Sequence, residues 1–155
     1  MTHSDPDNRA PIRAGDIVSD EDADRIYDRV IKCALPRPEW THPAHLVFAT
    51  VLLERMGLAG AEQSMPGMIR AYNESVGTPN NDSEGYHHTI TLFFLRHIDA
   101  FSGSLSDGSV GAAATRLLAS PLAAPDYPLI YYSKELLFSV EARRNWIEPD
   151  LKPLD

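Results

Sequence analysis

Four of the six histidines of this chain lie in two short clusters, T-H-P-A-H-L at residues 41–46 and G-Y-H-H-T-I-T at residues 85–91. Neutral imidazole is the commonest metal ligand in proteins, and imidazole also titrates near neutral pH. Two such clusters brought together by helix packing would form either a metal site or an acid–base site. The sequence therefore indicates where chemistry would occur without identifying a substrate.

Three of these histidines form the expected metal site, namely His42, His45 and His87. His42 and His45 are three positions apart, so both imidazoles project from one side of the first turn of a helix. A site of three histidines with one open position suits a divalent metal such as zinc, iron or manganese. Without a metal, the same pocket would use a histidine with a shifted pKa as a general acid or base.

Residues of the second cluster would carry the chemical step. His88 is expected to act as a base or as a fourth ligand, with Tyr86 and Thr91 as neighbouring catalytic groups. The alternative is that these histidines cap helices or bind backbone groups and have a structural role. Both interpretations favour the neutral imidazole, because a positive charge is unfavourable beside the N-terminus of a helix.

Apolar residues at helical spacing predict six helical segments, and no segment alternates convincingly as a strand would. The expected helices lie at about residues 20–34, 41–57, 60–76, 82–102, 112–119 and 133–146. Ser19 and Thr41 are expected to cap the first and second helices, and Asp82 or Ser83 the fourth.

Glycine and proline predict where these helices break. Gly57 ends the second helix. Pro66 predicts a kink in the third helix or a later start near Ser64. The last helical segment is expected to divide at Ser139, and the three prolines of residues 121–132 predict a mostly irregular loop.

The predicted fold class is all-α, a single-domain helical bundle of about six helices. Residues 19–155 form this domain, and residues 1–18 are expected to form a flexible arm that docks through Ile17 and Val18. Cys33 is expected to be buried on the first helix, which disfavours a thiol nucleophile.

Charge and composition restrict the partners. The net charge of −8 disfavours nucleic acid or an anionic membrane. No run approaches the length of about 20 apolar residues that spans a bilayer, and residues 1–15 show no apolar stretch of the signal-peptide type. A single cysteine cannot form an internal disulfide, which suits a reducing compartment, so we expect a cytoplasmic protein. The histidine clusters lead us to expect a small-molecule ligand. A homodimer is left open. The adjacent Arg143 and Arg144 are expected to pair with acidic residues, and the alternative is that they bind an anionic substrate.

Three segments also carry a resemblance, W-T-H-P-A-H-L, Y-H-H-T-I-T-L-F-F-L and A-R-R-N-W-I-E-P-D-L-K-P-L. Together they resemble a family of small, mostly uncharacterised bacterial helical proteins, over about residue 39 to the end. The resemblance implies that the two clusters form one site, and it implies no named activity. The positions that it selects are His42, His45, Tyr86, His87, Thr89 and Thr91. The chain departs from the pattern at His88, where glutamate is expected, and at Ala44, where an acid is frequent. Bundles of the DinB type are similar only in class, because their ligand spacing differs.

Two functions from different classes follow from the sequence. The first is a small soluble enzyme with a histidine-lined pocket between two helices, with or without a metal, acting on a small polar molecule. The second is a non-catalytic binding or regulatory helical module with structural histidines. An exposed apolar patch and histidines that do not converge would favour the second.

Overall fold

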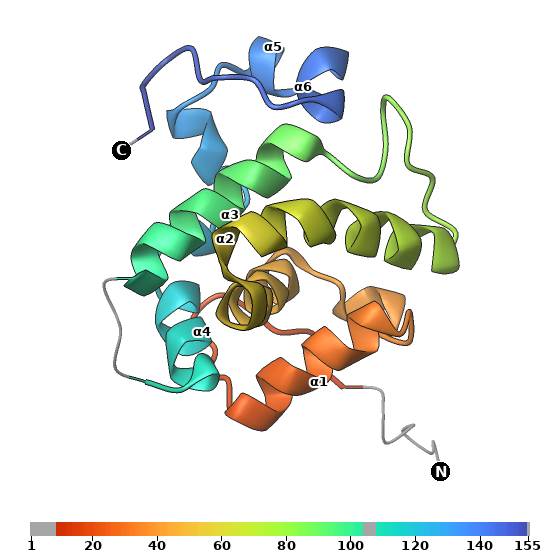
Figure 1. The fold of residues 1–155 in the computed structure, drawn as a ribbon, viewed down its shortest axis with the longest axis vertical. Helices are drawn as coiled ribbons and strands as arrows, with labels where there is room; N and C mark the ends of the chain where they lie inside the picture. Colours follow the sequence, from red (N-terminus) through yellow and green to blue (C-terminus); the bar gives the residue numbers. More distant parts are fainter. Residues whose placement is uncertain (1–8, 104–107, 155) are drawn as a thin grey trace.

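Six α-helices and three short 3-10 helices build the fold, and no strand occurs in residues 9–103 and 108–154, which the computed structural model describes (Figure 1). The predicted all-α fold class is therefore confirmed. The α-helices are α1 (Asp20–Ile31), α2 (His42–Ser75), α3 (His88–Gly103), α4 (Val110–Leu118), α5 (Lys134–Leu137) and α6 (Val140–Arg144). The 3-10 helices are η1 (Arg37–Glu39), η2 (Pro121–Ala123) and η3 (Tyr127–Ile130).

Hydroxyl side chains fix where most helices begin. The side chains of Ser19, Thr41, Ser109, Ser133 and Ser139 each accept a backbone N–H of the first turn of the helix that follows. Such a bond satisfies a donor that has no partner within the helix. The predicted caps at Ser19 and Thr41 are confirmed, as is the division of the last segment at Ser139.

Helix α2 is bent into two arms at Gly57, whose φ of 73° is accessible to glycine at little cost. The two arms correspond to the second and third predicted helices. Gly57 is the one residue of α2 with non-helical backbone angles, so the expected start near Ser64 is wrong. The second arm continues through Pro66 because Met65 and Ile69 are buried on either side of it. By length and hydropathy α2 could cross a membrane, but it is bent, and 56% of its most apolar stretch is buried in the fold.

The start of α3 differs from the prediction, since neither Asp82 nor Ser83 caps it. The side chain of Asn81 accepts the N–H groups of Ser83 and Glu84, which holds this segment in a turn instead of a helix. Gly85 then takes a φ of 81°, and an added Cβ would clash with the carbonyl oxygen of Pro79. The helix therefore begins only after this turn.

The first helix is shorter than expected and ends at Ile31. Cys33 follows with a φ of 55° and is exposed, so its predicted burial on the helix is wrong. The reason is that the backbone reverses direction here, with the N–H of Ala34 bonded back to the carbonyl of Arg29.

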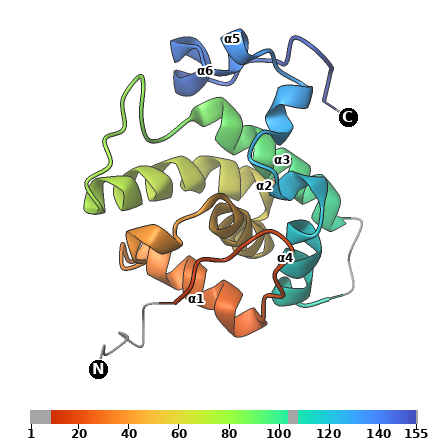
Figure 2. The same ribbon diagram turned by 180° about the vertical axis from the view of Figure 1, so that it is seen from behind.

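The two arms of α2 form the centre of the packing. This helix packs against α1, α3 and α4, and α3 packs in turn against α6. Figures 1 and 2 show α1 and α4 at one end of the molecule and α5 and α6 at the other, with α3 between them. Of the predicted arm, residues 1–8 lie outside the described residues. Val18 is buried in the core as expected, whereas Ile17 is exposed.

Candidate functional site

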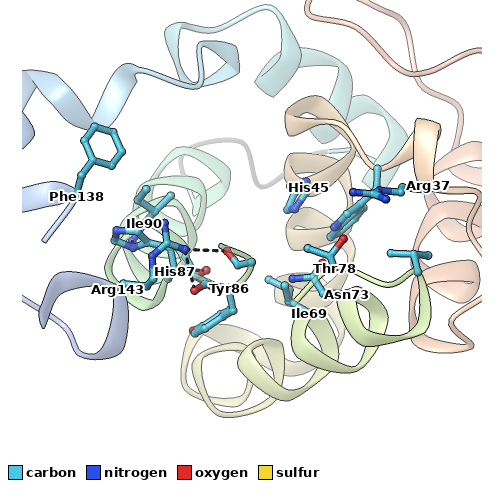
Figure 3. Close-up of a pocket in the computed structure, with 14 residues that line it drawn as sticks. Arg37, His45, Ile69, Asn73, Thr78, Tyr86, His87, Ile90, Phe138 and Arg143 are labelled. Carbon is cyan, nitrogen blue, oxygen red and sulfur yellow. Dashed lines mark hydrogen bonds between the residues drawn. The ribbon is translucent and has the colours of Figure 1, made fainter. Parts of the chain in front are cut away.

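A cleft of about 490 Å³ lies where the start and the end of α2 face the start of α3 and helix α6 (Figure 3). Its polar lining comprises Arg37, Asn73, Thr78, Tyr86, Arg143, His45, His87 and Thr91. In Figure 3, His45 and Arg37 lie on one side of the cleft, and His87 and Arg143 lie on the other. Each histidine cluster therefore contributes one imidazole to the lining of the same cleft.

His45 is held by its own helix and by a neighbouring ring. Its Nδ1–H donates to the carbonyl oxygen of Thr41 at 2.7 Å, and its ring stacks on Trp40 with centroids 3.6 Å apart. Among the described residues Nε2 has no hydrogen-bond partner, and no fully buried side-chain nitrogen or oxygen lacks one. Nε2 is therefore not fully sealed within the fold, and His45 contributes to the lining of the cleft. Burial lowers the pKa of His45 to about 4, so the imidazole is neutral at pH 7 and Nε2 carries a lone pair.

His87 has a structural role at the start of α3. Its Nδ1 accepts the N–H of Ile90 at 3.1 Å, as an N-cap does, and its Nε2–H donates to the carbonyl oxygen of Leu137 at 2.7 Å. Both ring nitrogens thus have partners. Burial lowers the pKa of His87, which keeps the ring neutral as this double bonding requires. At this position, the structure has the helix-capping arrangement that the sequence left open.

His42 does not line the cleft. Its Nε2–H donates to the carbonyl oxygen of Leu122 at 3.2 Å, and its ring packs against Phe94. No group of three histidine, cysteine or acidic side chains among residues 9–103 and 108–154 is arranged to hold a metal ion. The structure does not assemble His42, His45 and His87 as one set of ligands, and binding of zinc, iron or manganese stays a prediction.

The other three predicted site residues lie at the start of α3, with Tyr86 just before the helix and His88 and Thr91 on it. The Tyr86 hydroxyl lies 2.7 Å from His88 Nδ1, and Thr91 Oγ1 donates to the carbonyl oxygen of His87. Burial raises the pKa of Tyr86 to about 12, so its hydroxyl stays protonated in the hydrogen bond with His88. Tyr86 and Thr91 line the cleft, while His88 is absent from its lining. Their catalytic role stays a prediction.

Two arginines give the cleft a positive charge. The sequence left anion binding open for Arg143 and gave no sign of Arg37. Arg37 and Arg143 line it and no carboxylate does, although the whole chain carries a net charge of −8. The two adjacent arginines of α6 bind different partners. Arg144 binds Asp82 as expected, whereas Arg143 donates to the carbonyls of Gly85 and Tyr86. Adjacent helical residues point about 100° apart, which is the signal that both could not reach the same acid.

Comparisons of this chain with protein-family models, with curated proteins and with solved structures found no match.

Proposed function

We propose that the protein is a small enzyme that binds a small organic anion in this cleft and that His45 accepts a proton from the bound molecule. The observation that carries the proposal is that His45, whose Nε2 has no hydrogen-bond partner among the described residues, lines a cleft with two arginines and no carboxylate. The two arginines attract the negative charge of the ligand, and the imidazole of His45 acts as the base.

The charge of the lining selects the ligand. A guanidinium group has five N–H donors and binds carboxylate or phosphate oxygens in pairs. Arg143 uses Nη1 for the two carbonyls, and its other donors stay available. Arg37 is exposed at the edge of the cleft and forms no ion pair with a carboxylate of the described residues. An anion would therefore meet positive charge on both sides of the cleft.

The bound anion would also strengthen the base. An imidazole with a pKa of about 4 is neutral at pH 7 but accepts protons weakly. A negative charge near Nε2 favours the imidazolium form and raises the pKa towards neutrality. The Nδ1–H bond to the Thr41 carbonyl favours the same form, because that carbonyl stabilises the protonated ring. Ligand binding and activation of the base are thus coupled in this proposal.

Anion binding is tested by isothermal titration calorimetry with acetate, succinate and inorganic phosphate at low ionic strength and pH 7. We expect binding that weakens as sodium chloride is added, and a loss of about tenfold in affinity in Arg143→Gln and in Arg37→Gln. Arg144→Gln is the matched control, since it removes the same charge from α6 outside the cleft. Equal weakening by all three variants would show a general charge effect and contradict the proposal.

The role of His45 is tested by proton NMR. Addition of a bound acid should raise the pKa of the His45 ring. In D₂O the wild type should exchange or convert protons of that acid, and His45→Gln should bind the acid without doing so. A second candidate, a non-catalytic binding module, is favoured by the backbone bonds of His42 and His87. It predicts the same anion binding with no proton exchange that depends on His45.

A further inference from the structure

A second cavity of about 240 Å³ lies between the two arms of α2 and helix α3, next to the cleft. Most of its lining is aliphatic or aromatic, from Leu46, Ala49, Met65, Phe94, Leu95 and Ile98. These six residues are all buried. The cavity is therefore an apolar space between the longest helices of the fold.

The few polar groups of this apolar cavity are mostly committed to other partners. His42 Nε2 bonds to the Leu122 carbonyl and Thr91 Oγ1 to the His87 carbonyl. The exceptions are Nε2 of His45 and Nδ1 of His42, which have no hydrogen-bond partner among the described residues. A polar group placed here would lose most of its hydrogen bonds to water, because the rest of the lining offers no partner, whereas an apolar group gains by leaving water.

The cleft and the apolar cavity adjoin at one place. Four residues, His45, Ile69, Ile90 and Thr91, line both. The two arginines line the cleft and not the apolar cavity, so positive charge lies on one side of His45 and apolar surface on the other. A molecule that is anionic at one end and apolar at the other would match both sides, with its middle atoms beside His45.

We propose that the ligand of this site is an amphipathic carboxylate, with its charged end in the cleft and its apolar group in the second cavity. This inference rests on the proposed function, because it takes the anion site in the cleft as given. A cavity of about 150 Å³ accepts benzene. By the same scale, the apolar group contains about six to nine carbons, as an aromatic ring or an alkyl chain.

The test is calorimetric titration of the full-length protein with linear carboxylates from acetate to octanoate, and with 1-hexanol as the neutral counterpart. Each added methylene should tighten binding about fourfold until the cavity is filled. Hexanoate should bind more tightly than 1-hexanol, since the alcohol lacks the charge that the arginines attract.

Substitution within the cavity provides the second part of the test. Ala49→Leu adds a side chain to the cavity lining, so octanoate should bind no more tightly than butanoate while acetate is unaffected. Ala49→Val is a smaller change, and the affinity should stop rising at a shorter acid than in the wild type. This variant replaces Ala49→Leu in the test if circular dichroism shows that the leucine variant is unfolded. Ala100→Leu, an exposed site on α3, is the control that keeps the full dependence on chain length.

The outcomes separate this inference from the proposed function. If acetate binds but longer acids gain nothing, the amphipathic ligand is refuted and the anion site stands. If no acid binds at any length, both proposals fail. If 1-hexanol binds as tightly as hexanoate, or if folded Ala49→Leu keeps the full gain with length, the two cavities do not share one ligand.

Discussion

Replacement of His87 with alanine should destabilise the fold, because this residue joins α3 to the C-terminal segment. In the variant the Ile90 N–H loses its capping acceptor, and the Leu137 carbonyl, 50 residues along the chain, loses its donor. The His87 side chain belongs to a residue that is 8% exposed, so water replaces these partners poorly. A metal ligand would behave differently, since its removal would act through loss of the metal.

The size of the effect follows from these contacts. Loss of an N-cap costs about 1 kcal/mol, and loss of a hydrogen bond to a buried group costs about 1–2 kcal/mol. Together with some packing of the ring, the sum for His87→Ala is about 3 kcal/mol of unfolding free energy. For a domain of this size, each 1 kcal/mol shifts the melting temperature by about 2–4 °C, which gives a decrease of about 6–12 °C.

Urea denaturation followed by circular dichroism at pH 7.5 measures this free energy. His87→Asn should recover about 1 kcal/mol, because asparagine accepts the Ile90 N–H as an N-cap but does not replace the bond to Leu137. The wild type should show the same urea midpoint with and without EDTA. An alanine variant as stable as the wild type, or a wild type that EDTA destabilises by a similar amount, would refute the structural role.

Three further predictions follow from the described contacts. Burial lowers the pKa of all four clustered histidines, so the unfolded chain binds more protons below pH 6.5 and stability should fall between about pH 6.5 and 4. The His45 share is at most about 3 kcal/mol, and urea curves at pH 7.5 and 4.5 should differ less in His45→Gln. Thr89→Val should lower the free energy of unfolding by about 2–3 kcal/mol and speed hydrogen exchange of the Ile147 amide, because Thr89 Oγ1 donates to the Asn145 carbonyl and accepts the Ile147 N–H. Unchanged exchange at Ile147 would contradict this. Exposed Cys33 should react with a thiol reagent in the native protein, and Cys33→Gly should stabilise it by about 1 kcal/mol or less, as its positive φ suits glycine; a slow thiol or a less stable glycine variant would be the contrary result.

Local signals in the sequence predicted elements well where the stabilising contact is itself local. The caps at Ser19 and Thr41 bond to N–H groups three residues away, and Gly57 bends α2 through its own φ. The start of α3 could not be found in this way. The residue that caps it, His87, forms its second bond with the distant carbonyl of Leu137. In the preceding turn, the Asn81 side chain binds N–H groups that would have belonged to the earlier helix start we predicted.

The same distinction applies to the candidate site. Residue types and spacing indicated both histidine clusters, and each cluster has a member in the cleft. The charge of the cleft was not predictable, because Arg37 lies on η1 and Arg143 on α6, more than 100 residues apart in the chain, and tertiary packing alone brings them to one cleft.

Backbone groups determine which histidine of each cluster is available for chemistry. The Thr41 carbonyl binds His45 Nδ1 and leaves Nε2 without a partner among the described residues, whereas Ile90 and Leu137 occupy both nitrogens of His87. Substitution of these two histidines should therefore separate function from stability. His45→Gln should lose proton exchange and should lose less stability at pH 7.5 than His87→Ala, because it removes one hydrogen bond, from Nδ1 to Thr41, together with the packing on Trp40. His87→Ala should lose stability, and its folded fraction should keep the exchange. If the two variants showed the reverse pattern, the base would have to be sought at His87, and the assignment of roles from hydrogen bonding would be wrong.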